Sequence, residues 1–114
     1  NIWATWCAPC MLELPYLQKV HEALGERSGA QVVTLNIDRN PGLVAPFLER
    51  HGYTFPVCLA TDNVGEIGGA SSVPQTWIVD RDGIIRHSQN GFDPTGGDRW
   101  TAEVLAMVAS LADR

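Results

Sequence analysis

The chain has 114 residues, 45% of them hydrophobic and 18% charged, and its formal net charge is −5. This composition predicts one globular domain over residues 1–114 and excludes a disordered chain. Lys19 is the only lysine, so the sequence lacks the basic patch with which proteins bind nucleic acids or anionic membranes. Three cysteines cannot build a disulfide framework, and no apolar run approaches the roughly 18 residues of a membrane span.

The first half of the chain predicts strands that alternate with helices. Asn1–Ala4 is expected to be the last part of a buried strand that begins upstream, because no turn or helix cap precedes it. Apolar residues at helical spacing predict a helix over Ala8–Leu24, with Pro9 in its first turn and Gly25 as its stop. A β-branched run predicts the next strand, and an Asn-Pro pair starts the helix that follows it: Gln31–Asp38 and Pro41–Arg50.

The second half predicts two short elements, a hairpin and a closing helix. Phe55–Leu59 suits a short strand, and Asp62–Gly69 suits a weak helix interrupted by glycine. Asp82-Gly83 supplies the positive φ of a tight turn, so the flanking strands are expected to pair antiparallel: Gln75–Asp80 and Ile84–Gln89. The last helix, Asp98–Ala112, carries an apolar stripe toward the sheet: Trp100, Val104, Leu105, Val108 and Leu111.

This order of elements predicts an α/β fold with one mixed central sheet. Parallel strands joined by helical crossovers come first, and an antiparallel hairpin follows them. We therefore expect helices on both faces of the sheet.

Cys7 and Cys10 stand three residues apart, where the first predicted strand ends and the first predicted helix begins. The positive end of a helix dipole favours the thiolate form of a cysteine at this position, and the thiolate is the nucleophile in disulfide exchange. We predict that Cys7 attacks a substrate disulfide. Cys10, one turn further on and less exposed, is expected to resolve the mixed disulfide that results.

Two other uses of the cysteine pair remain open at this point. A zinc site needs two further ligands, but the other candidates do not form a second close pair: Cys58, His21, His51 and His87. A purely structural disulfide between neighbours this close removes little entropy from the unfolded chain. Redox chemistry is therefore favoured, and neither a metal nor a cofactor is expected.

Two segments of the chain resemble landmarks of the thioredoxin superfamily. The first is its active-site segment, matched by Ile2-Trp3-Ala4-Thr5-Trp6-Cys7-Ala8-Pro9-Cys10. The second is the cis-proline loop opposite the cysteines, matched by Val73-Pro74-Gln75-Thr76. Within the superfamily the chain is similar to the extracytoplasmic, often membrane-tethered branch that includes TlpA, ResA and the cytochrome c maturation reductases.

Three features carry the similarity to this branch. Thioredoxins themselves have a buried acid where this chain has Asn1, whereas the branch commonly has Asn there and a carboxylate at the position of Glu13. The segment Leu43–Asp62 resembles the β-α element that the branch inserts into the minimal fold, and Ile78–Ile85 matches its terminal hairpin. The resemblance implies a thioredoxin-like fold whose N-terminal hairpin and first half of the central strand precede Asn1.

The resemblance also assigns roles to individual residues. It implies that Glu13 exchanges the proton of Cys10, the other interpretation being an ordinary carboxylate on the helix surface. We expect Trp6 to shield the disulfide while Trp3 lies in the core. The substrate groove is implied to consist of Trp6, Ala8, Pro9, Val73 and Pro74, with a cis Val73–Pro74 bond and backbone pairing between Val73 and an extended substrate.

The resemblance therefore implies a thiol–disulfide oxidoreductase that reduces protein disulfides outside the cytoplasm. Cytochrome c maturation is one process that such an activity would serve. A membrane thiol donor would reduce it again, and any signal or membrane anchor would lie upstream of Asn1. We expect a periplasmic or otherwise extracytoplasmic monomer that binds no nucleic acid. Two alternatives stay open: a general thioredoxin-like electron donor, and a metal-binding module built on the Cys-x-x-Cys pair.

Cys58 lies in an apolar predicted strand. Free cysteine in such a segment usually behaves as a small buried hydrophobe, so burial is the prediction for this side chain. A third redox thiol is the rival interpretation.

Overall fold

The computed structural model describes residues 1–26, 28–66 and 72–112, and a five-stranded mixed sheet forms its centre. The strands lie in the order β3-β2-β1-β4-β5. β1 and β3 both run parallel to β2, whereas β4 is antiparallel to β1 and to β5. Their bounds are Ile2–Trp3 (β1), Thr34–Asn36 (β2), Val57–Leu59 (β3), Gln75–Val79 (β4) and Ile85–Asn90 (β5).

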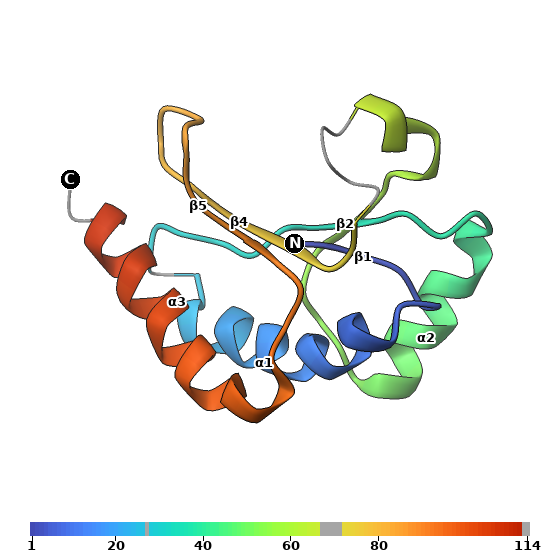
Figure 1. The fold of residues 1–114 in the computed structure, drawn as a ribbon, viewed down its shortest axis with the longest axis horizontal. Helices are drawn as coiled ribbons and strands as arrows, with labels where there is room; N and C mark the ends of the chain where they lie inside the picture. Colours follow the sequence, from blue (N-terminus) through green and yellow to red (C-terminus); the bar gives the residue numbers. More distant parts are fainter. Residues whose placement is uncertain (27, 67–71, 113–114) are drawn as a thin grey trace.

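The α-helices lie on one side of this sheet, and a 3₁₀ helix lies on the other (Figure 1). The α-helices are α1 (Ala8–Leu24), α2 (Val44–His51) and α3 (Gly97–Ala112); the 3₁₀ helices are η1 (Pro41–Leu43), η2 (Thr61–Glu66) and η3 (Pro94–Gly96). The steps from β1 to β2 and from β2 to β3 go in the same direction along the sheet, so right-handed crossovers place α1 and α2 on the same face. η2, which follows β3, lies on the opposite face (Figure 1).

The elements with strong local signals have the predicted bounds to within one residue. α1 spans Ala8–Leu24, with Cys7 as its N-cap, and ends at Gly25, whose φ of 57° few other residues adopt. The β4–β5 hairpin turns at Gly83, where φ is 80°.

Several predicted elements are shorter than expected. The strand predicted over Gln31–Asp38 is limited to Thr34–Asn36, because that is the stretch opposite its partners β1 and β3. Phe55–Leu59 is likewise limited to Val57–Leu59. The second helix begins with the 3₁₀ turn η1, which Asn40 caps, and continues as α2 to His51. The weak helix predicted over Asp62–Gly69 is the 3₁₀ helix η2, and residues 67–69 lie outside the described part of the chain.

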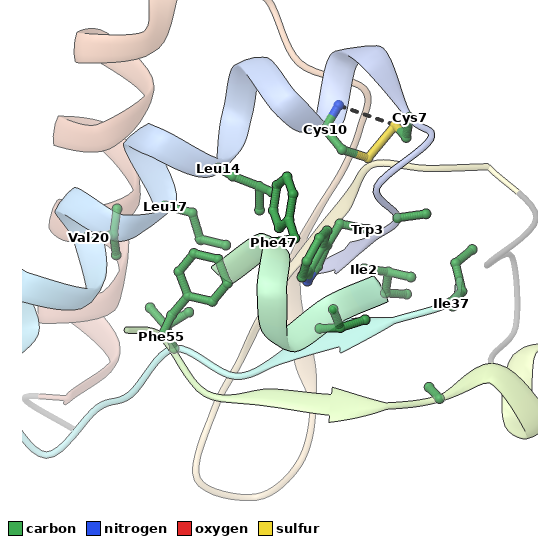
Figure 2. Packing of buried hydrophobic residues seen from close by; sticks show 14 of the residues in the cluster. Ile2, Trp3, Cys7, Cys10, Leu14, Leu17, Val20, Ile37, Phe47 and Phe55 are labelled. Carbon is green, nitrogen blue, oxygen red and sulfur yellow. Dashed lines mark hydrogen bonds between the residues drawn. A yellow bond between two sulfur atoms is a disulfide. The ribbon is translucent and has the colours of Figure 1, made fainter. Parts of the chain in front are cut away.

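The core fills the space between the sheet and the α-helices (Figure 2). Trp3 is fully buried at its centre, where its ring lies 5.4 Å from that of Phe47 on α2 and 6.3 Å from that of Phe55. α1 contributes Leu14, Leu17 and Val20, and α3 contributes Trp100 and Val104. The same α1 residues that carry the helical pattern thus pack the first helix onto the strand that leads to Cys7.

Cys58 is exposed, so the prediction of a buried side chain was wrong. The residue lies on β3, the edge strand of the sheet, which pairs only with β2 in the part of the chain that the structure describes. β3 and α2 together form the inserted element expected over residues 43–62.

Among the described residues, no helix combines the length and the apolar character needed to cross a bilayer.

Candidate active site

A tight turn delivers Cys7 from β1 to the start of α1. The backbone N–H of Cys7 donates to the carbonyl oxygen of Ala4 (3.2 Å), which closes a four-residue turn through Thr5 and Trp6. Cys7 then caps the helix, because its Sγ accepts a hydrogen bond from the backbone N–H of Cys10 (3.2 Å). The sulfur therefore lies where the helix presents unpaired N–H donors.

Cys7 and Cys10 form a disulfide, with their Cα atoms 5.2 Å apart (Figure 2). Both are buried in this oxidised state, Cys7 with 4% and Cys10 with 0% of its surface exposed. Trp6 is 65% exposed beside them, in contrast to the buried Trp3. The division between a core tryptophan and a surface tryptophan is the one expected from strand alternation.

Ala8 and Pro9, which lie between the two cysteines, are both exposed. Together with Trp6 they surround the disulfide with solvent-accessible, mostly apolar side chains. A partner that approaches the cysteine pair would meet these side chains first.

The Val73–Pro74 peptide bond is cis, as the resemblance implied. β4 begins directly after it, and because β4 runs antiparallel to β1 with Gln75 opposite Ile2, the start of β4 lies beside the end of β1. Val73 and Pro74 therefore lie at the end of the sheet where Cys7 leaves β1. Pro74 is fully buried, and its carbonyl oxygen accepts from the N–H of Gly91 (2.9 Å).

Glu13 is a buried carboxyl on α1, with no exposed surface. Its Oε1 accepts from the side-chain amide of Asn1 (2.5 Å), and its Oε2 accepts from the hydroxyl of Thr76 (3.5 Å). Burial raises the pKa of Glu13 from 4.5 to about 7, while the hydrogen bonds from Asn1 and Thr76 act in the opposite direction. Glu13 is one turn beyond Cys10, on the same side of the helix.

The described residues contain no group of three or more His, Cys, Asp or Glu side chains placed to share a metal ion. Cys58, which the sequence left open as a ligand or third thiol, lies on the edge strand β3.

Sequence reasoning missed three residues near the site. Thr76 was noted only as part of the cis-proline motif, but its hydroxyl contacts both Asn1 and Glu13. Thr5 and Asp38 received no role, yet the Asp38 carboxylate accepts two hydrogen bonds from Thr5. The one signal available was the position of Asp38 at the end of a predicted strand, where parallel α/β sheets place their functional groups.

The five-stranded sheet, the helix that begins at a Cys-x-x-Cys disulfide and the cis-proline loop define a thioredoxin-like protein. Residues 1–105 match the family model described as Redoxin, and the chain belongs to this family.

Individual relatives and solved structures resemble the chain, and the names of two of the three described here refer to thiol–disulfide chemistry. The chain is 31% identical over 87 residues to thiol-disulfide oxidoreductase ResA of Geobacillus thermodenitrificans, a match that covers 75% of this chain and 49% of that protein. It is similar to the crystal structure of StoA from Bacillus subtilis, with 27% identity, a TM-score of 0.68 and coverage of 88% of this chain and 78% of that one. A thiol:disulfide interchange protein of the thioredoxin family from Chlorobium tepidum gives 26% identity, a TM-score of 0.70 and coverage of 92% and 77%. The chain spans about half the length of the curated relatives it matches.

Proposed function

We propose that this protein is a thiol–disulfide oxidoreductase that reduces disulfides in other proteins. The observation that carries the proposal is the Cys7–Cys10 disulfide at the N-terminus of α1, where Cys7 Sγ already accepts a backbone N–H. The names of the Geobacillus thermodenitrificans and Chlorobium tepidum relatives support the same chemistry.

The reaction uses the two cysteines in turn. In the reduced protein the Cys7 thiolate attacks one sulfur of a substrate disulfide, forms a mixed disulfide and releases the other substrate sulfur, which takes up a proton. The Cys10 thiolate then attacks Cys7 Sγ and releases the second substrate thiol. Two electrons pass to the substrate, and the Cys7–Cys10 disulfide remains. The N–H of Cys10 stabilises negative charge on Cys7 Sγ while it is a thiolate.

Glu13 is the group we assign to the proton of Cys10. The thiol of Cys10 must lose its proton before it can attack, and both side chains are fully buried. A carboxyl whose pKa is about 7 can accept and return a proton near neutral pH, which an ordinary glutamate cannot do as readily.

We assign substrate contact to the exposed side chains of Trp6, Ala8 and Pro9 and to the loop at Val73 and Pro74. An extended substrate segment beside the disulfide could pair with the backbone of Val73 by strand addition. Recognition of this kind depends little on side chains, so it suits proteins with different sequences around their disulfides.

The cellular setting of the proposal follows from the family branch. We infer that the protein acts as a monomer outside the cytoplasm, on protein disulfides that include those of cytochrome c maturation, and that a membrane thiol donor reduces it again. Neither nucleic acid nor a metal takes part in this chemistry.

A trapping experiment tests the proposal. The Cys10→Ser variant should accumulate a mixed disulfide through Cys7, because the resolving thiol is gone, and the double variant Cys7→Ser, Cys10→Ser should capture nothing. Mass spectrometry of the captured partners then identifies the substrate class. Capture of a peroxidase or a methionine sulfoxide reductase would favour a general electron donor, and stoichiometric zinc in the untagged protein would favour a metal-binding module.

A further inference from the structure

Asp38 is a buried carboxylate two residues after the end of β2, with 1% of its surface exposed. It accepts three hydrogen bonds from groups without formal charge. Its Oδ2 accepts from the backbone N–H of Thr5 (2.9 Å) and from the side-chain amide of Asn36 (2.7 Å), and its Oδ1 accepts from the hydroxyl of Thr5 (2.7 Å). Burying a carboxylate costs free energy unless such donors surround it, so the position of Asp38 requires an explanation.

Two of these three hydrogen bonds come from one residue of the turn that carries Cys7. Thr5 is the second residue of the turn closed by the Cys7 N–H to Ala4 carbonyl bond. Its backbone and its hydroxyl are held by different oxygens of the same carboxylate, which fixes both the peptide plane and the side-chain rotamer. The contact links residues 33 positions apart in the sequence.

Asp38 is itself fixed by two hydrogen bonds of its own backbone. Its backbone N–H donates to Asn36 Oδ1 (3.0 Å), and its carbonyl oxygen accepts from the hydroxyl of Thr61 at the start of η2 (2.5 Å). Asn36 is fully buried and lies opposite Trp3 in the sheet. The carboxylate is therefore a rigid acceptor attached to the sheet, and Thr5 is the group that it orients.

We propose that Asp38 and Thr5 position Cys7: the carboxylate clamps the Ala4–Cys7 turn so that Cys7 Sγ stays at the N-terminus of α1. The proposal rests on the thiol–disulfide function proposed above and adds two positioning residues to it. Both are assigned to positioning and not to bond making. They act through the turn, because Cys7 Sγ can accept the N–H of Cys10 only when the turn places it at the helix end.

The first test compares two substitutions at position 5. Thr5→Ser keeps the hydroxyl, whereas Thr5→Val keeps the shape and loses the hydrogen bond to Asp38 Oδ1. We expect Thr5→Val to slow iodoacetamide alkylation of Cys7 in the reduced protein at pH 7 by about threefold to tenfold, because only part of the strength of this hydrogen bond acts on Cys7 through the turn. Thr5→Ser should stay within about twofold of the wild type. The reduction potential of the Cys7–Cys10 couple, measured against glutathione, should shift in Thr5→Val only.

The second test separates geometry from charge at position 38. In Asp38→Asn the remaining oxygen can still accept from Thr5 N–H and Asn36, and the new amide can donate to the Thr5 hydroxyl, so the clamp persists without the charge. We expect Asp38→Asn to alkylate within about twofold of the wild type and Asp38→Ala to be at least as slow as Thr5→Val, because Asp38→Ala also removes the acceptor of the Thr5 N–H. The double variant Thr5→Val, Asp38→Ala should be no slower than Asp38→Ala alone, because Asp38→Ala already removes the acceptor of the Thr5 hydroxyl.

A matched control removes a threonine hydroxyl elsewhere. Thr54 accepts from the Gln18 side chain (2.8 Å), away from the cysteines, so Thr54→Val should leave the alkylation rate and the potential unchanged. The clamp is overturned if Thr5→Val equals the wild type in both readouts, or if Asp38→Asn is as slow as Asp38→Ala. The proposed function fails separately, when the wild type itself neither forms a reversible Cys7–Cys10 disulfide nor reduces a protein disulfide.

Discussion

The side-chain amide of Asn1 donates a 2.5 Å hydrogen bond to the buried carboxyl of Glu13. Asn1 lies directly before β1, and Glu13 lies in α1. The same amide donates to the hydroxyl of Thr76 on β4 (3.0 Å), which in turn donates to Glu13. A donor from the residue before β1 and a donor from β4 thus converge on the carboxyl that we assign to the proton of Cys10. The proton affinity of Glu13 depends on these donors as well as on its burial.

The raised pKa of Glu13 predicts that stability falls as pH rises from about 4.5 to about 7. In this window the unfolded chain has released the Glu13 proton while the folded protein still holds it, so folding is favoured at the acid end and the advantage is lost as pH passes the folded pKa. The shift corresponds to roughly 3 kcal/mol. Glu13→Gln should remove this part of the pH dependence in urea unfolding of the oxidised protein.

The control for this prediction is Glu49→Gln, which changes an exposed glutamate on α2. It should leave the wild-type profile intact. Parallel profiles for the wild type and Glu13→Gln between pH 4.5 and 7.5 would contradict the raised pKa.

Thr76 supplies a hydrogen bond that lowers the pKa of Glu13. Thr76→Val removes this donor and should raise the Glu13 titration midpoint above its wild-type value near 7, by up to about one unit. Thr76→Ser keeps the hydroxyl and should titrate as the wild type does. Carbon-13 NMR of the Glu13 side-chain carboxyl measures the midpoint directly, and equal midpoints in all three proteins would show that Thr76 has no influence on it.

Phe47 joins α2 to the centre of the core through its contact with Trp3. Phe47→Ala should destabilise the protein by about 3 kcal/mol, because it leaves a cavity beside a tryptophan that is fully buried. Leu43→Ala removes an apolar side chain that is 50% exposed in the preceding 3₁₀ turn and should change stability by no more than about 0.5 kcal/mol. Chemical denaturation gives both values, and equal losses would argue against the core position of Phe47.

Gly97, the first residue of α3, packs against the ring of Tyr16 on α1. A Cβ placed there would overlap the ring of Tyr16, so Gly97→Ala should cost about 1–3 kcal/mol despite the higher helix propensity of alanine. At the neighbouring Gly96 the nearest atom, Asp93 Oδ2, is 3.7 Å away, and Gly96→Ala should be tolerated. Adding Tyr16→Ala to Gly97→Ala removes the overlap and should reduce the additional cost of the alanine. Thermal unfolding of Gly97→Ala, Gly96→Ala, Tyr16→Ala and the double variant tests this, and equal melting temperatures for the two single glycine variants would refute the prediction.

The amino-acid sequence alone determined the features that depend on neighbouring residues. The helix over Ala8–Leu24 and the turn at Gly83 follow from helical periodicity, a proline in the first turn and glycine at positive φ. The placement of Cys7 and Cys10 at a helix start is equally local, because a strand end and a helix start meet within a few residues. The cis Val73–Pro74 bond was predictable only through the family resemblance, since local chemistry favours trans.

Only the tertiary structure decided the features that depend on distant partners. The strand expected over Gln31–Asp38 is shorter because a strand extends as far as its hydrogen-bonding neighbours do, and Cys58 is exposed because its strand is at the sheet edge. The burial of Glu13 and the clamp between Asp38 and Thr5 join residues that no local pattern connects. Burial and hydrogen-bond partners are properties of the assembled sheet and helices, and they set the proton affinity and the orientation of groups whose identity the sequence already shows.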